Sequence, residues 1–451
     1  MRSKFFPIIG FLIFFVLIFS LLKFPTKAAE PSGINLDMEA IVNEALENNP
    51  AVHAARKEHQ AAKLMVHPAG ALPDPRLIIG LEAVPVDTFA LNEIDMTQKI
   101  IGITQPLPFP GKLKLGRAVA ESDAQSAGHK ARIIENRTAY EIRSTFFEWA
   151  LSEEDVRITQ KNINVMDQFA DVAMSNYTVG KSAQWDILQA QVQRAKLSER
   201  LITKKQEIES MRAMMAKLLG RDQPLLDGTP AVKWTPVMQL NEKELLKRAD
   251  ENNPELAYLR SLAGKADNSA QLARKERLPD FSFTLSYGFR EDGKMNGVTQ
   301  KRPDLMSAML EVMLPLYSSR KQIPQVQAAQ NMSLSARHML EDGRLQIHAE
   351  IRNRMLSVRR ADEIKELYRT SILPQTRTAV ESALASYGVN KLDFLTLLTS
   401  QMNLFEHELD YYKVQINREI DFAALALLIG EQITPKNTGA SAGGNESQVK
   451  K

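Results

Sequence analysis

Apolar and polar side chains alternate with a period of two in one stretch of the second half of the chain. Over residues 281–290, apolar residues alternate with small or polar ones, which is the period of a β-strand. Ten residues is about the length of a strand that crosses a bilayer at a tilt. A partner stretch, 305–314, has an apolar face and places Ser307 and Glu311 on the other face. The two stretches predict a hairpin of bilayer length, joined by the polar loop 291–303.

The first half contains two weaker alternations, at residues 76–84 and 97–105. Their pattern is imperfect because Glu82 shares a face with the apolar Ile78. A loop that includes residues 85–88 separates them. We expect a second hairpin here, which gives four transmembrane strands in one chain.

Each predicted hairpin ends at a proline, in the stretches 103–112 and 312–321. Proline cannot donate a hydrogen bond to a strand ladder, and it favours an extended conformation in the residue before it. Small or cationic residues follow, and then a helical pattern that lasts for dozens of residues. These junctions predict a change from a membrane-spanning sheet to water-exposed helices.

The helical pattern after the first junction runs from residue 111 to 177 without a proline. One straight helix of that length would measure roughly 100 Å, so we expect it to fold back near residues 151–155. A further helix is predicted over 185–219, and short helices begin around Pro50 and Pro254. In the second half, helices are predicted over 320–356, 362–387 and 392–429, with the corresponding reversal near 357–363.

The two halves of the chain are related by an internal repeat. Glu47-Asn48-Asn49-Pro50 recurs as Glu251-Asn252-Asn253-Pro254, about 205 residues later. Tyr177-Thr178-Val179-Gly180-Lys181 recurs as Tyr387-Gly388-Val389-Asn390-Lys391, about 210 residues later, and both halves end in a Leu-Gly or Ile-Gly pair. We therefore predict two structural repeats, 30–220 and 242–430, joined by the linker 221–241. Residues 431–451 are rich in Gly, Ser, Asn and Lys, and we expect a disordered tail.

The N-terminus has the features of an export signal. Arg2 and Lys4 precede an apolar run over residues 5–22, and small residues follow up to Ala29, as in a cleavable signal peptide over 1–29. The run is also long enough for an uncleaved membrane anchor, which is the alternative. No later apolar run has that length. The chain contains no cysteine, which excludes disulfides and a lipid-modified N-terminal cysteine.

Composition narrows the class of protein further. The chain has 451 residues, of which 25% are charged, and its net charge is +3. This charge is too small to indicate nucleic-acid binding.

Four strands cannot close a barrel, since even small barrels need about eight, and open sheet edges are not tolerated in lipid. The chain must therefore form an oligomer. A trimer with twelve strands is our expectation, although spacing alone leaves a dimer or a tetramer open.

No catalytic constellation is present in the sequence. The seven histidines show neither the His-Glu-x-x-His spacing nor any pairing with cysteine. Met306, Met309 and Met313 could contact a soft metal, but Met306 points away from the other two and packing or lipid contact is the preferred role. We therefore expect no enzyme activity, no cofactor and no metal site.

Two sets of polar residues are candidates for a transport role. The acidic stretch near the first predicted reversal and the mixed charges near the second could pair around a symmetry axis as a periplasmic gate, or form an ordinary solvated turn. The candidate gate residues are Glu153, Glu154, Asp155, Arg359, Arg360 and Asp362. The candidate lining of the barrel lumen comprises Ser282, Thr284, Ser286, Arg290 and Glu311.

The whole mature chain resembles the outer membrane factor family, the TolC-like channel-tunnels. The resemblance rests on the paired Asn-Asn-Pro motifs, the paired Tyr-x-Val-x-Lys helix breaks, and the junctions at 106–112 and 315–321. Residues 96–98 and 107–112 are more similar to the heavy-metal efflux branch of that family. The resemblance implies an α+β membrane protein, with a trimeric barrel in the outer membrane and a helical tunnel in the periplasm. It also implies a periplasmic adaptor and an inner-membrane transporter of the RND type as partners.

The predicted function is passive conduction of substrates from an inner-membrane pump and its adaptor to the exterior. A soluble periplasmic coiled-coil adaptor would also contain long helical hairpins, but it would leave the alternation over 281–290 unexplained. An outer-membrane component of type I protein secretion is a further alternative. The sequence leaves the cargo open among metal ions, drugs and polypeptides.

Overall fold

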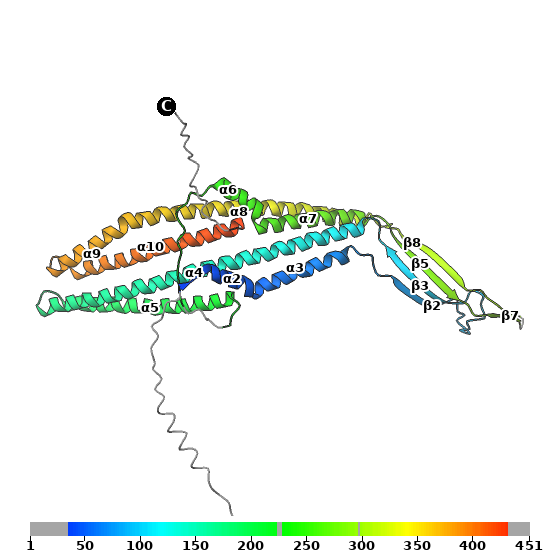
Figure 1. The fold of residues 1–451 in the computed structure, drawn as a ribbon, viewed down its shortest axis with the longest axis horizontal. Helices are drawn as coiled ribbons and strands as arrows, with labels where there is room; N and C mark the ends of the chain where they lie inside the picture. The colour runs from blue at the N-terminus through cyan, green and yellow to red at the C-terminus, as the bar shows by residue number, and fades with distance from the viewer. Residues whose placement is uncertain (1–34, 223–227, 296–297, 432–451) are drawn as a thin grey trace, which may run out of the picture.

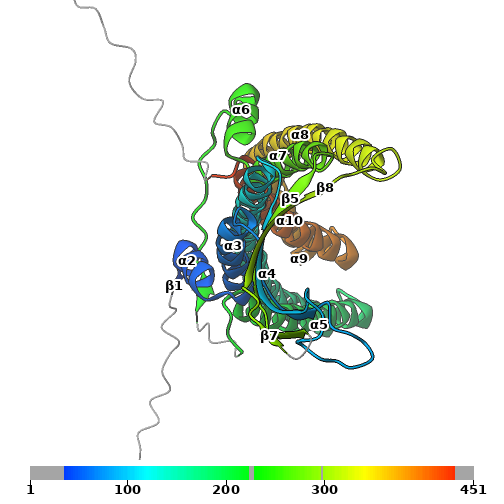
Figure 2. The same ribbon diagram turned by 90° about the vertical axis from the view of Figure 1, so that its right-hand side faces the viewer.

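The protein is elongated, with long helices at one end and a small sheet at the other (Figure 1). The computed structural model describes residues 35–222, 228–295 and 298–431. The predicted signal peptide and residues 432–451 of the predicted tail lie outside the described residues. Seen from the sheet end, the sheet and the helices curve into an arc (Figure 2). The arc has the shape of one segment of a tube.

Four antiparallel strands form the main sheet. They are β2 (Arg76–Glu82), β3 (Gln98–Leu107), β5 (Asp280–Phe289) and β8 (Leu305–Met313), in the order β2-β3-β5-β8. β2 is two residues shorter than predicted because Ala83 has a positive φ of 54°, which a β-strand cannot contain. Two short strands, β6 (Gly293–Met295) and β7 (Val298–Gln300), extend the loop between β5 and β8.

The first long helix does not reverse where the sequence analysis placed its turn. α4 (Lys112–Thr178) is continuous over 67 residues, and α5 (Gln184–Leu218) returns along it. The reversal lies at residues 179–183, where Gly180 takes a φ of 71°. The amide of Lys181 donates to the carbonyl of Asn176 at 2.8 Å, a bond typical of a Schellman helix end. The prediction at 151–155 was wrong because those residues contain no helix breaker and continue the buried face of α4.

The predicted reversal in the second half was also wrong, and the long helix there differs from α4 by containing a π-helical turn. α8 (Gln322–Leu367) passes through the predicted turn at 357–363 and continues through a π-helical turn, η1 (Tyr368–Ile372), into α9 (Leu373–Gly388). The reversal lies at 389–393, and α10 (Phe394–Ile429) returns. Pro374 explains the π turn, because it lacks the N–H that an α-helix would direct to the preceding turn. The first repeat has no proline in α4.

Each repeat begins with a pair of short helices that the Asn-Asn-Pro motif separates. They are α2 (Met38–Asn48) and α3 (Pro50–Ala69), and α6 (Glu242–Asn252) and α7 (Pro254–Lys275). Asn49 caps α3, and its amide nitrogen donates to the carbonyl of Leu218 at 2.8 Å. Asn253 caps α7 and donates to the carbonyl of Leu428 at 2.7 Å. The motif therefore ties the start of each repeat to the end of its last helix. A two-stranded contact, β1 (Asn35–Leu36) with β4 (Thr229–Pro230), joins the N-terminal end to the linker.

The hydrophobic core is divided into clusters along the tube. One cluster, near the reversals, joins both repeats through Phe169, Tyr387 and Phe394, with the rings of Tyr387 and Phe394 5.4 Å apart. A second lies around Phe146 in the first repeat, and a third around Ile351 in the second. In the described part of the chain, no helix has both the length and the apolar character needed to cross a membrane.

Candidate functional site

The two faces of the sheet differ in chemistry. One face carries Ser282, Thr284, Ser286 and Glu311, four of the candidate lumen residues. Thr104 and Thr284 on this face lie 2.8 Å apart through their hydroxyls, and Ser282 donates to Glu311 at 2.9 Å. The sheet therefore has a polar face built by hydrogen bonds between neighbouring strands.

The opposite face carries exposed apolar side chains. β5 contributes Phe283, Leu285 and Tyr287 to it, and β3 contributes Ile101 and Ile103, all between 40% and 48% exposed. Isolated in water, such a surface would be unfavourable. A sheet with one polar and one apolar face matches the wall of a membrane channel.

Arg290 does not lie on the polar face with the other predicted lumen residues. β5 ends at Phe289, so Arg290 turns into the loop region beyond the strand. Its guanidinium lies 3.1 Å from the Asp95 carboxylate and is only 9% exposed. Arg302 reaches the same carboxylate at 3.0 Å and donates to the carbonyls of Asn92 and Ile94. The two arginines thus hold the β2–β3 loop, residues 83–97, against the β5–β8 loop.

The acidic candidate gate residues lie in the middle of α4 and are paired within the first repeat. Glu153 accepts a hydrogen bond from the indole of Trp149 at 2.9 Å, and Glu154 pairs with Arg157. Asp155 is 10% exposed in its side chain and lies 3.0 Å from Arg200. That hydrogen bond raises the pKa of Arg200 above its ordinary value.

The basic candidate gate residues are also remote from a helix reversal. Arg359 and Arg360 are exposed on α8, and neither has an ion pair among the described residues. Asp362 instead pairs with Arg418, a guanidinium that is 1% exposed and also donates to the carbonyl of Thr235 in the linker. The structure therefore does not bring Arg359 or Arg360 together with Glu153 or Asp155 in one protomer. Any pairing of these charges between protomers stays a prediction.

The helix reversals are the functional candidates that the sequence analysis missed. Val179 and Val389 occupy equivalent positions in the two turns, and each is 64% exposed. Asn390 adopts a φ of 58°, as Gly180 does in the first turn. The signal was present in the sequence as the repeated Tyr-x-Val-x-Lys break, which marks the turn itself rather than the end of a returning helix.

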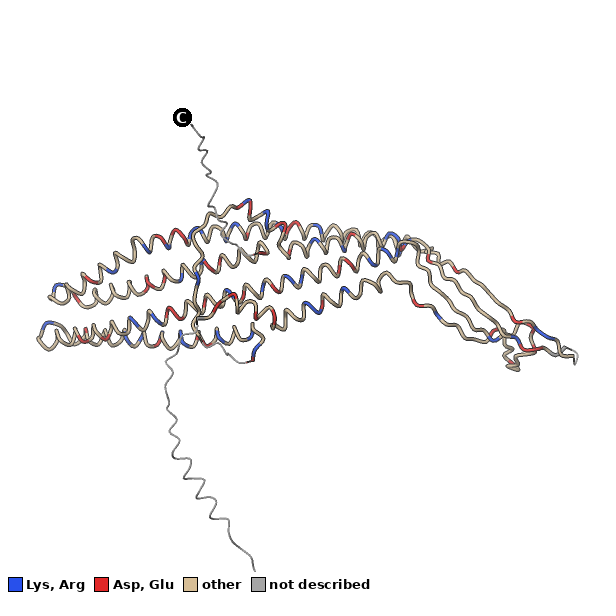
Figure 3. The backbone as a smooth tube through the Cα atoms, viewed as in Figure 1, with Lys and Arg blue, Asp and Glu red and all other residues tan. Residues whose placement is uncertain are grey.

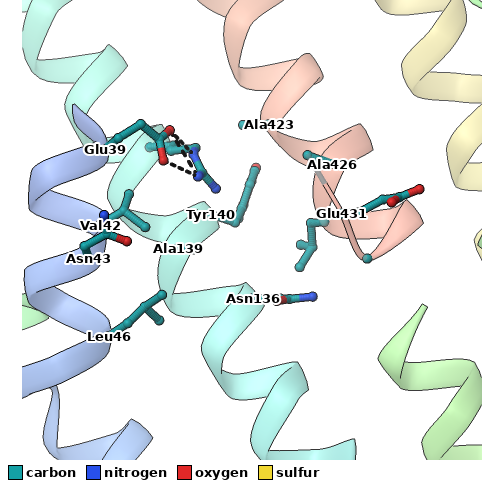
Figure 4. A pocket seen from close by; sticks show the side chains of 13 residues that line it. Glu39, Val42, Asn43, Leu46, Asn136, Ala139, Tyr140, Ala423, Ala426 and Glu431 are labelled. Atoms are coloured by element: carbon teal, nitrogen blue, oxygen red, sulfur yellow. Dashed lines mark hydrogen bonds and ion pairs between the residues drawn. The ribbon is translucent and has the colours of Figure 1, made fainter. Parts of the chain in front are cut away.

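A small pocket lies between α2, α4 and the end of α10 (Figure 4). Its volume is about 220 Å³. Arg143 donates to both carboxylate oxygens of Glu39, at 3.2 and 3.0 Å, so this ion pair is fully engaged on the pocket wall. Among the residues that the structure describes, no three His, Cys, Asp or Glu side chains are grouped so that they could hold a metal ion.

A sheet with one apolar face that continues into helices of roughly 100 Å defines a membrane channel with an attached helical tunnel. The chain matches the family model described as outer membrane efflux protein over residues 41–221 and 245–431. It is 24% identical over 403 residues to the cobalt-zinc-cadmium resistance protein CzcC of Cupriavidus metallidurans, covering 87% of this chain and 88% of that protein.

Solved structures share the fold. The structure of CusC matches with a TM-score of 0.75 at 14% identity, covering 88% of this chain and 93% of that one. VceC of Vibrio cholerae matches with a TM-score of 0.74 at 16% identity, covering 88% of this chain and 96% of that one.

The chain belongs to the outer membrane efflux protein family. It is an outer-membrane channel of a tripartite efflux system, with a tunnel in the periplasm. Its fold class is the expected one, in which three protomers of four strands complete a barrel that continues into a helical barrel. The alternative of a soluble adaptor is thereby set aside.

Proposed function

We propose that this channel exports divalent heavy-metal cations, working with a periplasmic adaptor and an inner-membrane pump of the RND type. The similarity to CzcC over 87% of the chain carries the proposal. The chain acts as a passive duct and not as an enzyme, so selection of the cargo falls to the pump.

The polar face of the sheet supports conduction rather than binding. Its hydroxyls at Thr104, Thr284 and Ser282 are engaged with each other or with Glu311. A lumen lined in this way offers hydrated ions a polar wall without a ligand set that would trap them. We assign Ser282, Thr284, Ser286 and Glu311 to the lumen of the barrel.

The two reversals, 179–183 and 389–393, are the proposed contact with the adaptor. They lie at the end of the molecule farthest from the sheet (Figure 1), which faces the inner membrane if the sheet lies in the outer one. Three protomers present six such turns. Each turn exposes a valine beside a lysine, Lys181 or Lys391, and so combines apolar contact area with a charge that can orient a partner.

The experiment compares growth of a deletion strain with strains that carry the chain or its variants. Deletion should lower the tolerated concentration of Co²⁺, Zn²⁺ or Cd²⁺ several-fold, and the wild-type chain should restore it. Val179→Asp combined with Val389→Asp should fail to restore tolerance while still forming a trimer. Val237→Asp is the control, because Val237 is 72% exposed in the linker, away from both turns. Unchanged metal tolerance in the deletion strain would exclude the proposed cargo.

A further inference from the structure

A group of cations without acidic partners lies where the helices meet the sheet. They come from the end of α7 and the start of α8, where Lys and Arg gather at the junction (Figure 3). The group comprises Arg274, Lys275, Arg277, Arg320 and Lys321. Within the described residues none of these five makes an ion pair, although 32 ion pairs occur elsewhere, mostly along the helices. The absence of carboxylate partners leaves these charges available to an external anion.

The nearby acidic groups do not neutralise this group. Asp280 is engaged by Lys112 at 2.8 Å and by the backbone amide of Phe109 at 2.7 Å. Glu276 is the remaining carboxylate of the segment 274–280, and it is exposed. The local balance is therefore cationic.

The position of Lys275 shows on which face of the sheet the five cations lie. Its ammonium lies 5.5 Å from the centre of the Phe109 ring, and Phe109 stacks on Phe281 with ring centres 6.5 Å apart. Phe281 belongs to the same face of β5 as Phe283 and Leu285, the apolar face. Lys275 thus stands on the lipid-facing side, next to the end of that face.

A pocket of about 480 Å³ lies beside Lys275, between the ends of three helices of one protomer. Leu115, Leu278 and Ser318 line it together with Arg274, Lys275 and Arg277. Leu316 and Tyr317 precede Ser318 in the chain and are 79% and 78% exposed. The surface therefore combines cations with exposed apolar and aromatic side chains, a combination typical of the membrane–water interface.

We propose that this surface binds the headgroup of an anionic glycerophospholipid from the periplasmic leaflet of the outer membrane. The inference rests on the assignment of the sheet to that membrane. β5 and β8 have 10 and 9 residues and are roughly 30 Å long at 3.3 Å per residue, the length of a strand that crosses a bilayer at a tilt. Residues a few positions beyond their helical ends therefore lie in the headgroup layer. Arg274, Lys275 and Arg277 engage the phosphate, and an acyl chain runs along Leu316 and Phe281.

The test uses the intact trimer purified in detergent and measures retained lipid by native mass spectrometry. After exposure to mixed micelles of phosphatidylglycerol and phosphatidylethanolamine, the wild-type trimer should retain up to three molecules of phosphatidylglycerol. The variant with Arg274→Gln, Lys275→Gln and Arg277→Gln should retain at least tenfold less. The single variant Lys275→Gln serves if the triple variant fails to trimerise, and it should also reduce retention.

The matched control removes three exposed lysines from α5 and α10, through Lys196→Gln, Lys205→Gln and Lys413→Gln, and should retain lipid as the wild type does. Equal retention of phosphatidylethanolamine by the wild type would overturn the proposal, as would full phosphatidylglycerol retention in the triple variant. Metal tolerance is measured separately in cells. Loss of lipid from the triple variant with intact tolerance would support the lipid site and leave the proposed cargo standing, whereas unchanged tolerance in the deletion strain would exclude the cargo without counting against the lipid site.

Discussion

Asn253 shows how a single residue joins the two ends of a repeat. Its side-chain oxygen accepts hydrogen bonds from the amides of Glu255 and Leu256, and its amide nitrogen donates to the carbonyl of Leu428. Leu428 belongs to α10, which is followed by Gly430. A Cβ at Gly430 would lie 2.3 Å from the carbonyl oxygen of Asn252. Close approach of the two segments therefore requires glycine at the end of α10 and asparagine at the start of α7.

We predict that Asn253→Ala destabilises the second repeat by about 1–2 kcal/mol, since a lost N-cap costs about 1 kcal/mol and the partly buried hydrogen bond to Leu428 is also removed. The measurement is the temperature at which the trimer dissociates in SDS, which should fall. Asn252→Ala is the control, because the Asn252 amide makes only a long contact, 3.5 Å, with Glu431. Equal effects of the two variants would contradict the role given to Asn253.

At the same scale, the sequence revealed which residues recur but not what they contact. Glu153, Asp155 and Asp362 were grouped as a gate because they lie near the two predicted helix reversals. Their partners are instead Trp149 one turn earlier in the same helix, Arg200 in α5 and Arg418 in α10. A charge in a long amphipathic helix has the same sequence signal whether it is buried in a pair or lines a tunnel. Only the packing of neighbouring helices distinguishes the two.

Among the elements, the strands could be predicted well where alternation was complete and less well elsewhere. The strand from residue 281 was placed within one residue, because its alternation is uninterrupted. The helix reversals were misplaced by about 25 to 30 residues, since a compact domain seldom contains a helix of roughly 100 Å. The expected helix length was taken from globular proteins, whereas a tunnel that spans the periplasm needs a helix of roughly 100 Å. Pro374 was the unused signal for the π turn that distinguishes the second repeat from the first.

Arg290 and Arg302 hold the β2–β3 loop against the β5–β8 loop, and we call these contacts the clamp. The prediction at this scale tests the clamp. Arg302→Gln should free the β2–β3 loop, because it removes the ion pair with Asp95 and the hydrogen bonds to two loop carbonyls. Intact cells treated with the Glu-specific protease V8 should then show cleavage after Glu93 at least about fivefold faster than wild type. Lys301→Gln, an exposed neighbour in the same loop, should not change the rate. Cleavage at the wild-type rate in Arg302→Gln would show that the clamp does not order the loop.

For the whole molecule, the order of the strands determines how protomers meet. β2 and β8 form the two edges of the sheet, and an edge within a membrane must be paired. Because neighbouring strands in the sheet are antiparallel, β2 and β8 run in opposite directions. β8 of one protomer can therefore pair antiparallel with β2 of the next around a closed ring, without any change of fold.

The chain has no cysteine, so engineered pairs can test this closure without background. Ile78→Cys in β2 should form a disulfide between protomers with one member of the series Ser307→Cys, Met309→Cys or Glu311→Cys, because these three positions lie on the same face of the sheet as Ile78. After oxidation, that variant should migrate as a covalent trimer on denaturing gels run without reducing agent. Met306→Cys and Ala308→Cys are the controls, since they lie on the opposite face and their Cβ atoms point away from that of Ile78. Covalent dimers that never reach the trimer, or cross-linking by the control positions alone, would show that the sheet does not close through its β2 and β8 edges.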